Sequence, residues 1–413
     1  MWNMYGKSYD LTKFITHHPG GSDILLKTKG GDDITALFET YHAFSDKEQI
    51  KKRLDKYEIK GISSNDNVIP KQYDFTNYDK LLNLVKKEFP DRKSTKINMF
   101  RILVNMTTSL SYSLFFYIAM LSKYSIYMRC MSSLFAGILW SSLGFNVMHD
   151  ASHYGVSIHP YVNSTLSKLW HGFGLWNSKM WFYHHVYHHH SFTGEDKKDP
   201  DLYNMCPLLR KNNNQNSNKF VKITSKNQGD VRYVIPLLCV FPGMYYGQSL
   251  VYFLSSIKAR VFSVKIPKIY YYDAIDILLI MFNLYCLYGG LPLPTIIYLI
   301  TINTLYQINI VADHDTYETA IENHYDGNDW LRLQIQNSGN FLNDNFIWTH
   351  MFGAINYQIE HHLFPNMSSV HYPKVKPIVM KYCQENNIPY VHHPTLWGAY
   401  KSYLKMLDYN KLI

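Results

Sequence analysis

Histidines carry the strongest chemical signal in this sequence. Nine of the 20 histidines lie within residues 149–190, and a further cluster lies at residues 358–362, about 170 residues later. Imidazole is a good ligand for iron, zinc and copper, and residues four apart lie on one face of a helix. Two pairs have this spacing: His149 with His153, and His185 with His189. The pattern predicts a histidine cage for metal, assembled from distant segments.

A separate histidine pair lies near the N-terminus. His18 begins an HPGG run, and His42 follows 24 residues later. The run alone indicates a tight turn into a helix, but two such histidines also suit the axial positions of one haem iron. Residues 1–62 resemble the cytochrome b5 family, which implies a small α+β domain that holds haem b between His18 and His42. That family's first strand and helix have no counterpart before Trp2, so we expect an N-terminally short domain.

The composition indicates a membrane protein with sizeable polar parts. Charged residues make up 18% of the 413 residues and aromatic residues 16%, as expected for aromatic belts at a membrane interface. The mean hydropathy is −0.22, so the chain cannot lie in a membrane throughout. The formal charge of +9 comes without a Lys/Arg-rich run typical of nucleic-acid binding. It favours contact with anionic headgroups or an anionic substrate such as an acyl-CoA.

Four apolar stretches predict membrane-spanning helices, each near the roughly 20 residues that a bilayer requires. Their approximate limits are 102–121, 127–147, 272–290 and 292–312. The two resulting hairpins place all three histidine clusters on one side of the membrane. A fifth span at 233–257 would put the last cluster on the opposite side, so we interpret that segment as interfacial or re-entrant. Basic residues before the first and third spans mark the shared side, with both termini, as cytosolic.

The segment between the two main parts, residues 63–96, is polar and charged. It indicates a linker followed by a short amphipathic helix at the membrane surface.

Residues 97–413 carry three boxes that resemble those of the membrane fatty acid desaturases. The boxes are HxxxH at 149–153, a histidine followed by a His-His pair within 184–190, and QxxHH at 358–362. Gln358 together with an N-terminal haem domain is similar to the front-end desaturases. The resemblance implies a mainly α fold, in which a four-span helical domain carries a cytosolic histidine-box cap. It also implies two non-haem iron ions, which activate O2 to remove two hydrogens from an acyl chain.

The resemblance further implies iron ligands in each box. The first and third boxes give His149, His153, His361 and His362, with Gln358 as a weak ligand or an orienting group. The second box allows two registers: either His185, His188 and His189, or His185, His189 and His190. The latter is favoured, because a Phe-Thr pair follows closely, as in Δ5-like members.

Two residues outside the box histidines have expected roles at the site. His314, just after the last predicted span, matches a further ligand of the superfamily, while a helix-capping role is equally consistent with its position. Asp150 is expected to orient a ligating imidazole rather than bind metal.

Together these features predict a front-end acyl desaturase that inserts a cis double bond into a polyunsaturated acyl chain, Δ5-like in regioselectivity. The implied partners are an acyl-CoA or acyl-lipid substrate, O2, the bilayer and NADH-cytochrome b5 reductase, and the implied location is the endoplasmic reticulum. A sphingolipid long-chain-base desaturase and a fatty acyl hydroxylase are alternatives. A non-catalytic haem or zinc protein is disfavoured, because structural zinc closes with four ligands and about eight histidines are available here.

Overall fold

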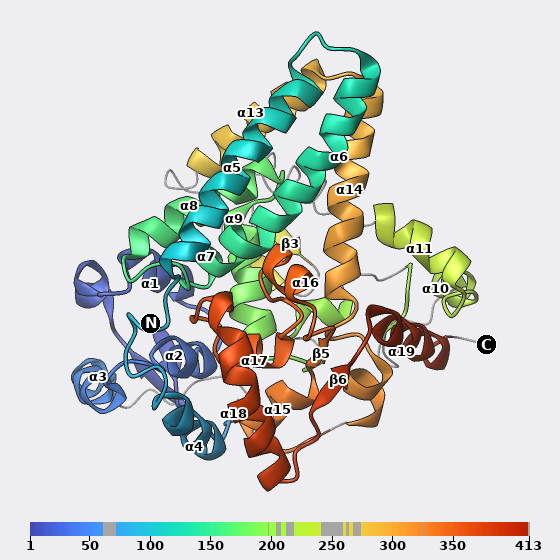
Figure 1. Cartoon of the computed structure of the whole chain (residues 1–413). Coiled ribbons are helices and arrows are strands. Elements are labelled where there is room, and N and C mark those ends of the chain that lie inside the picture. The colour runs from blue at the N-terminus through green and yellow to red at the C-terminus, as the bar shows by residue number, and fades with distance from the viewer. Residues whose placement is uncertain are drawn as a thin grey trace.

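The computed structural model describes residues 1–60, 72–196, 198–203, 208–211, 219–240, 259–261, 264–266, 274–323 and 325–411. Within these residues the protein is mainly helical, with three small two-stranded sheets. Long apolar helices project together from one end of the molecule. The opposite end is a cap of shorter helices, which contains the N-terminus and the last helix (Figure 1).

Four apolar helices form two hairpins that correspond to the predicted spans. They are α5 (Met99–Met120), α6 (Ile126–Leu143), α13 (Ala274–Gly289) and α14 (Pro292–Ile310). Three are long and apolar enough to cross a membrane: α5, α14, and α6 with its continuation to Ser152. Helix α13 is apolar but has 16 residues, which span roughly 24 Å at about 1.5 Å per residue. That is shorter than a hydrocarbon core of about 30 Å.

Arg129 lies in the α5–α6 hairpin, at the end remote from the cap, where a basic residue is unexpected. Its side chain is buried. Its Nε and Nη2 atoms donate to the carbonyl oxygens of Ala119 and Met120 at 2.9 and 3.0 Å. These carbonyls belong to the last turn of α5, where no intrahelical donor remains. The Arg129 side chain therefore caps the C-terminal end of α5.

The N-terminal unit is a small α+β arrangement. Strands β1 (Trp2–Met4) and β2 (Lys7–Tyr9) form an antiparallel hairpin. The helices that follow are η1 (Thr12–His17), α1 (Ser22–Thr28), α2 (Thr35–Tyr41), α3 (Lys47–Leu54) and η2 (Asp55–Tyr57). Trp2 is fully buried, and its Nε1 donates to the carbonyl oxygen of Leu25 at 3.0 Å. This bond ties the hairpin to α1.

Helix α4 (Thr76–Val85) is amphipathic, as predicted, but protein covers its apolar face. Tyr78, Leu81 and Val85 are fully buried and belong to the same apolar core as Trp330 of the cap. The Tyr78 hydroxyl also donates to the carbonyl oxygen of Leu363 at 3.1 Å. The predicted position of this helix on the membrane surface is therefore wrong, because tertiary packing covers the face that would have met lipid.

The cap is built mainly from C-terminal elements. They are η7 (Glu318–Glu322), α15 (Trp330–Gln336), β5 (Gly339–Phe341), α16 (Phe346–Met351), α17 (Gln358–Leu363), η8 (Ser369–His371), α18 (Tyr372–Glu385), β6 (Val391–His393) and α19 (Leu396–Tyr409). Strands β5 and β6 pair in parallel, with Gly339 opposite Val391. This pairing connects the segment before the third box to the segment that precedes α19.

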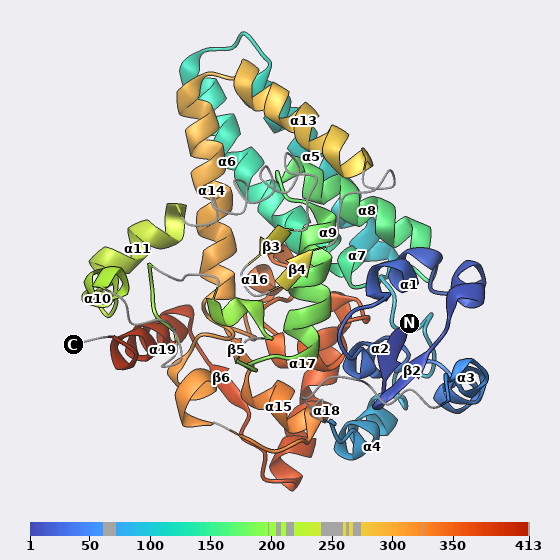
Figure 2. The ribbon, with the colours of Figure 1, turned by 180° about the vertical axis from the view of Figure 1, so that it is seen from behind.

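The middle of the chain lies between the apolar helices and the cap. Its elements are η3 (Gly144–His149), α7 (Asp150–Ser152), α8 (Pro160–Phe173), α9 (Ser178–Trp181), η4 (Phe182–His189), η5 (Pro200–Tyr203), α10 (Lys219–Ser225), α11 (Val231–Val240), β3 (Ala259–Val261) and β4 (Val264–Ile266). Seen from behind, α10 and α11 lie beside α14 and α19 (Figure 2). The predicted re-entrant segment begins in α11, and its remainder, 241–257, lies outside the described residues.

Candidate metal centre

Widened helical turns deliver the histidines of the first two boxes. Both η3 and η4 are π-helices, in which i→i+5 hydrogen bonds replace the usual i→i+4 bonds; such segments are frequent at functional sites. At the end of η4 this geometry brings the Nε2 atoms of His185 and His190 to 3.3 Å. In an α-helix, side chains five apart do not share a face. The π-helix therefore lets both histidines point at one site.

Eight histidines converge between the apolar helices and the cap and form what we call the histidine cage. They are His149, His153, His185, His189, His190, His314, His361 and His362. The first group within the cage consists of His149, His153, His185 and His361, whose ligand atoms lie within 4.8 Å of one another. The Nε2 atoms of His149 and His185 are 3.1 Å apart. Each of the four side chains is at most 5% exposed.

The second group within the cage consists of His189, His314 and His362. The Nε2 atoms of His189 and His314 are 3.2 Å apart. Gln358 Nε2 donates to His314 Nε2 at 2.7 Å, and Gln358 Oε1 is buried without a hydrogen-bond partner among the described residues. The glutamine of the third box therefore contacts this group directly.

His190 lies between the two groups. Its ring stacks on that of His362 with centroids 4.2 Å apart. The rings of His153 and His361 lie 4.5 Å away from it on the other side. The cage is thus one continuous assembly with two subsites.

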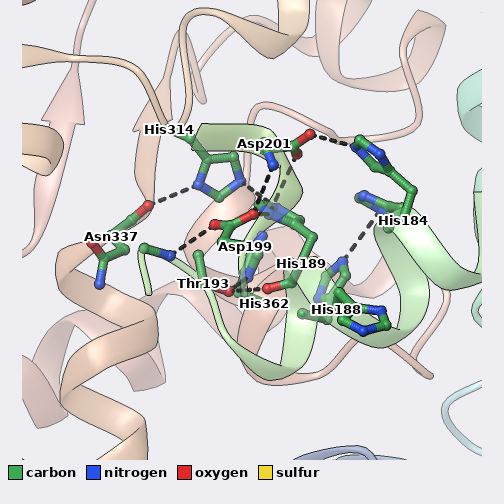
Figure 3. A network of polar contacts seen from close by, with 12 residues as sticks. His184, His188, His189, Thr193, Asp199, Asp201, His314, Asn337 and His362 are labelled. Carbon is green, nitrogen blue, oxygen red and sulfur yellow. Dashed lines mark hydrogen bonds and ion pairs between the residues drawn. The ribbon is translucent and has the colours of Figure 1, made fainter. Parts of the chain in front are cut away.

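Hydrogen bonds outside the cage fix how the second group is oriented (Figure 3). The Nδ1 atom of His189 lies 3.0 Å from Asp199 Oδ1 and 3.3 Å from Asp201 Oδ2. His314 Nδ1 lies 2.7 Å from the carbonyl oxygen of Asn337. Because carbonyl and carboxylate oxygens only accept, each ring holds a proton at Nδ1 and turns its Nε2 toward the other. Carboxylate–histidine–metal arrangements use this orientation.

The charge of the cage is set by burial and by the two carboxylates. Burial lowers the pKa of His314 to about 4. Burial alone would also lower the pKa of His189, but Asp199 and Asp201 outweigh it and raise the pKa to about 9. The two Nε2 atoms lie 3.2 Å apart, so the charge that the carboxylates favour on His189 lies next to His314. Both Nε2 atoms would have to be free of protons to bind a metal ion, so metal binding here would release protons.

The donor set fits metal ions. His153, His361 and His362 each have a buried Nε2 atom without a hydrogen-bond partner among the described residues. Their Nδ1 atoms are all bonded, that of His361 to the Tyr372 hydroxyl at 3.1 Å and that of His362 to Gln334 Oε1 at 2.9 Å. Buried polar atoms are rarely left unpaired. Several inward nitrogens without partners, all in one place, are what metal coordination would satisfy.

Two histidines of the second box lie outside the cage. His188 Nδ1 bonds the carbonyl oxygen of Tyr183 at 2.6 Å, and its Nε2 lies 3.6 Å from Asp32 of the N-terminal unit. His184 Nε2 lies 2.6 Å from Asp201. Of the two predicted registers, the one with His185, His189 and His190 is brought together, and the structure does not bring His188 to the cage.

Asp150 does not have the orienting role expected from the sequence. Its Oδ2 atom accepts from Ser368 Oγ at 2.9 Å, Ser369 N at 3.1 Å and Ser369 Oγ at 3.0 Å. It therefore anchors the segment after the third box to the start of α7. Asp199 and Asp201 are the carboxylates that hold a cage histidine instead.

Several residues that orient the cage were not predicted. Asn337, Gln334 and Tyr372 lie outside the three boxes, and no spacing in the sequence links them to a particular histidine. The Asp-Pro-Asp run at 199–201 does follow the second box closely. This pair of carboxylates close to a histidine cluster was the one sequence feature that could have indicated the residues that orient His189.

A second site lies in the N-terminal unit, where an apolar cavity is lined by Leu37, Phe38, His18 and His42. The rings of His18 and His42 have centroids 6.2 Å apart, with their planes at 65°. Their Nδ1 atoms bond the carbonyl oxygens of Gly21 at 3.0 Å and Phe38 at 2.9 Å. Burial lowers the pKa of His42 to about 4, so it is a neutral ligand. Both Nε2 atoms are therefore available for one iron ion between the rings.

Glycine is required in the HPGG turn. A Cβ atom at Gly20 would lie 2.7 Å from His18 Cε1, closer than real contacts allow. The glycine therefore lets the His18 ring lie over the turn.

An apolar pocket borders the first group of the cage. Its lining includes Trp140, Phe145, Met148 and Tyr306, together with His149 and His185. An acyl chain held there would lie beside the histidines with water excluded.

This arrangement defines a membrane metalloenzyme in which a haem-type domain is fused to a histidine metal centre. Residues 125–394 match the family described as Fatty acid desaturase, and residues 2–62 match the Cytochrome b5-like Heme/Steroid binding domain. The chain belongs to the fatty acid desaturase family.

Relatives similar to this chain extend over nearly its whole length. An Acyl-lipid (8-3)-desaturase of Physcomitrium patens is 30% identical over 98% of this chain and 86% of its own length. An enzyme of the same name from Mortierella alpina is 28% identical over 97% and 92%. The Delta(5) fatty acid desaturase A of Dictyostelium discoideum is 27% identical over 97% and 88%.

The family establishes the class of reaction and the cofactors. The protein is a membrane oxidoreductase with a fused cytochrome b5 domain. The cytochrome b5 domain implies haem, the desaturase family uses two iron ions, and the histidine groups fit that metal site. Its substrates are a lipid acyl chain and O2.

Proposed function

We propose that the protein is a front-end acyl-lipid desaturase with Δ5-like regioselectivity. The observation that carries the proposal is the histidine cage, which apolar side chains border on the side of His149 and His185. Δ5-like regioselectivity is supported by the names of the relatives from Mortierella alpina, Physcomitrium patens and Dictyostelium discoideum. An acyl group on a lipid, rather than on CoA, is the substrate that these names favour.

The two groups of the cage are proposed to hold one iron ion each. The first ion is assigned to His149, His153, His185 and His361, and the second to His189, His314 and His362. His190 lies where it can serve either ion, and Gln358 orients His314 or completes the second site. His188 is left out of the ligand set, because its two ring nitrogens bond outside the cage.

The protein's own residues hold the acyl chain and the ligands in place. When bound, the iron ions supply the redox chemistry that side-chain acids and bases lack. The apolar side chains beside His149, among them Met148 and Tyr306, would contact the acyl chain and keep water out. In the overall reaction, the acyl chain loses two hydrogens to form the double bond. O2 takes these with two electrons and two protons, which gives two waters.

The electrons are proposed to come from NADH-cytochrome b5 reductase through the fused haem domain. Tethering raises the local concentration of the haem near the cage. The cap, with the N-terminus, the haem pocket and the cage, is assigned to the cytosolic side of the endoplasmic reticulum membrane. Lys93 and Lys96 before α5, and Arg101 in its first turn, follow the positive-inside rule.

Expression in yeast supplied with polyunsaturated fatty acids tests the proposal. A Δ5 desaturase converts a precursor with a double bond at carbon eight into a product that has lost two hydrogens, with the new bond on the carboxyl side. His361→Ala in the cage is expected to give no product, and the exposed control His159→Ala is expected to match the unaltered protein. Addition of one oxygen would indicate a hydroxylase, and an altered long-chain base would indicate a sphingolipid desaturase; either result would overturn the proposal.

A further inference from the structure

The N-terminal unit contacts the histidine cage through Tyr41. Tyr41 is the last residue of α2, and it directly precedes His42 of the haem pocket. Its hydroxyl oxygen lies 2.9 Å from Nδ1 of His153. Among the hydrogen bonds of the described residues, this one joins the N-terminal unit to a cage histidine.

The position of the proton in this bond follows from the surroundings of His153. Its Nε2 atom is buried, has no hydrogen-bond partner among the described residues and belongs to the first group of the cage. The neutral ring then carries its proton at Nδ1, which donates to the Tyr41 oxygen. Tyr41 thus takes the place that a carboxylate or carbonyl takes beside other metal-binding histidines.

Neighbouring contacts hold Tyr41 in this position. Asn366, which follows the third box, donates Nδ2 to the carbonyl oxygen of Tyr41 at 3.0 Å. Lys96 donates to the carbonyl oxygen of Asn366 at 2.7 Å. The ring of Tyr154 meets that of Tyr41 edge-on, with centroids 6.3 Å apart. Residues outside the N-terminal unit therefore contact both the backbone and the ring of Tyr41.

Other bonds fix the two parts of the molecule against each other at some distance from Tyr41. The Tyr183 hydroxyl donates to the carbonyl oxygen of Lys27 at 2.6 Å, and the Tyr187 hydroxyl donates to that of Asp32 at 2.8 Å. Both tyrosines belong to η4, which also carries His185 and His189. The haem pocket is thus docked on the same helix that supplies the second box.

We propose that Tyr41 couples the haem pocket to the histidine cage and positions His153. The route runs from the His42 ring through the peptide to Tyr41, and then across one hydrogen bond to His153. Electrons tunnel more readily through bonded atoms than through gaps, and this route contains a single non-covalent step. With haem held by His18 and His42 and iron held by the first group, this route would carry one electron from the haem to the metal at His153. The phenol keeps its proton throughout.

This inference rests on the proposed function, since it requires haem in the N-terminal pocket and iron in the cage. Tyr41→Phe tests it, because the substitution keeps the ring and removes the hydroxyl that accepts from His153. Tyr187→Phe is the matched control. It also removes one tyrosine hydrogen bond between the two parts of the molecule, but that bond does not reach the cage.

The experiment uses the full chain, purified with haem and iron and reduced before rapid mixing with O2 and substrate. Haem reoxidation is followed by its absorbance, and the haem midpoint potential and iron content are measured separately. In Tyr41→Phe we expect reoxidation to slow about 10- to 100-fold, the range seen for outer partners of metal ligands. The haem potential and iron content should stay unchanged, and Tyr187→Phe should reoxidise like the unaltered protein.

Two results would overturn the inference. One is a reoxidation rate in Tyr41→Phe equal to that of Tyr187→Phe. The other is a loss of iron from Tyr41→Phe that by itself accounts for the slower rate, since Tyr41 would then be structural only. Failure of the proposed function is distinguishable, because it appears in the unaltered protein as missing iron or missing product.

Discussion

The haem pocket and the histidine cage both orient imidazole rings for iron, but the hydrogen-bond partners that orient the rings differ. In the haem pocket, His18 and His42 bond backbone carbonyls that lie three or four residues away in the chain. In the cage, His189 bonds the Asp199 and Asp201 side chains, and His362 bonds Gln334. The first arrangement is local and depends on the backbone. The second depends on side chains that only the complete fold brings together.

This difference predicts that a substitution can remove haem without removing the non-haem iron, or the reverse. It also predicts that the two sites differ in how strongly they respond to substitution of an orienting residue. The haem pocket is largely self-contained within the first 60 residues described. The cage requires elements from α6 to α17 at once. Substitutions that leave the fold intact but remove one outer partner should therefore affect the cage far more than the haem pocket.

The largest effect is expected from removing a cage ligand. His361→Ala takes one nitrogen from the first group and opens a buried gap beside His149 and His153. Desaturated product should fall below detection and the non-haem iron content should drop, while the haem absorbance stays intact. Loss of haem together with the iron would show that the two sites are not independent. Product analysis, iron analysis and the haem spectrum of one preparation decide between these results.

Removing a haem ligand should have the reverse pattern. His42→Ala takes away one of the two imidazole rings that line the pocket. The haem spectrum should disappear, and the cage should keep its non-haem iron. Desaturation should fall to the level that the separate cytochrome b5 of the host supports. Full activity without haem would contradict the route of electrons through the N-terminal unit.

An intermediate effect is expected from an outer partner of the cage. Asp199→Asn weakens the acceptor that faces His189 Nδ1 and removes the carboxylate charge. Activity or iron affinity should fall about 10- to 100-fold, as is typical of such partners. Asp196→Asn is the matched control, because that carboxylate accepts from Tyr203 and not from a histidine. Equal effects of the two substitutions would remove the orienting role from Asp199.

The haem pocket could be predicted from the sequence more completely than the histidine cage. The HPGG turn and His42 predicted the haem pocket, since its contacts are local. Box spacing indicated the cage histidines, and uncharged stretches indicated the apolar helices. The sequence could not reveal that η3 and η4 are π-helices, because the hydrophobic period of 3.6 residues does not report a local widening. The register of the second box depends on that widening.

The misplaced residues have a tertiary cause. Asp150 neighbours His149, so the sequence suggested that it orients a ligand, but Ser368 and Ser369 lie closer in space. Helix α4 has an amphipathic pattern that fits a membrane surface or a protein surface equally well. Its pairing with Trp330 and Leu363 depends on segments about 250 residues later in the chain.

The smallest effect is expected from His188→Ala, which tests the register directly. His188 bonds Tyr183 and approaches Asp32, away from the cage. Activity and iron content should stay within about twofold of the unaltered protein, as for substitutions that touch no metal ligand. The register with His185, His188 and His189 as ligands requires instead a loss as large as that of His361→Ala.

The central claim is that the cage holds two redox-active iron ions beside one haem. Metal analysis of the purified full chain, combined with Mössbauer spectroscopy, measures this most directly. We predict three iron ions for each chain, one in haem and two in nitrogen-rich non-haem sites, and loss of at least the ion of the first group in His361→Ala. Zinc in the cage, or two non-haem iron ions that persist in His361→Ala, would contradict it.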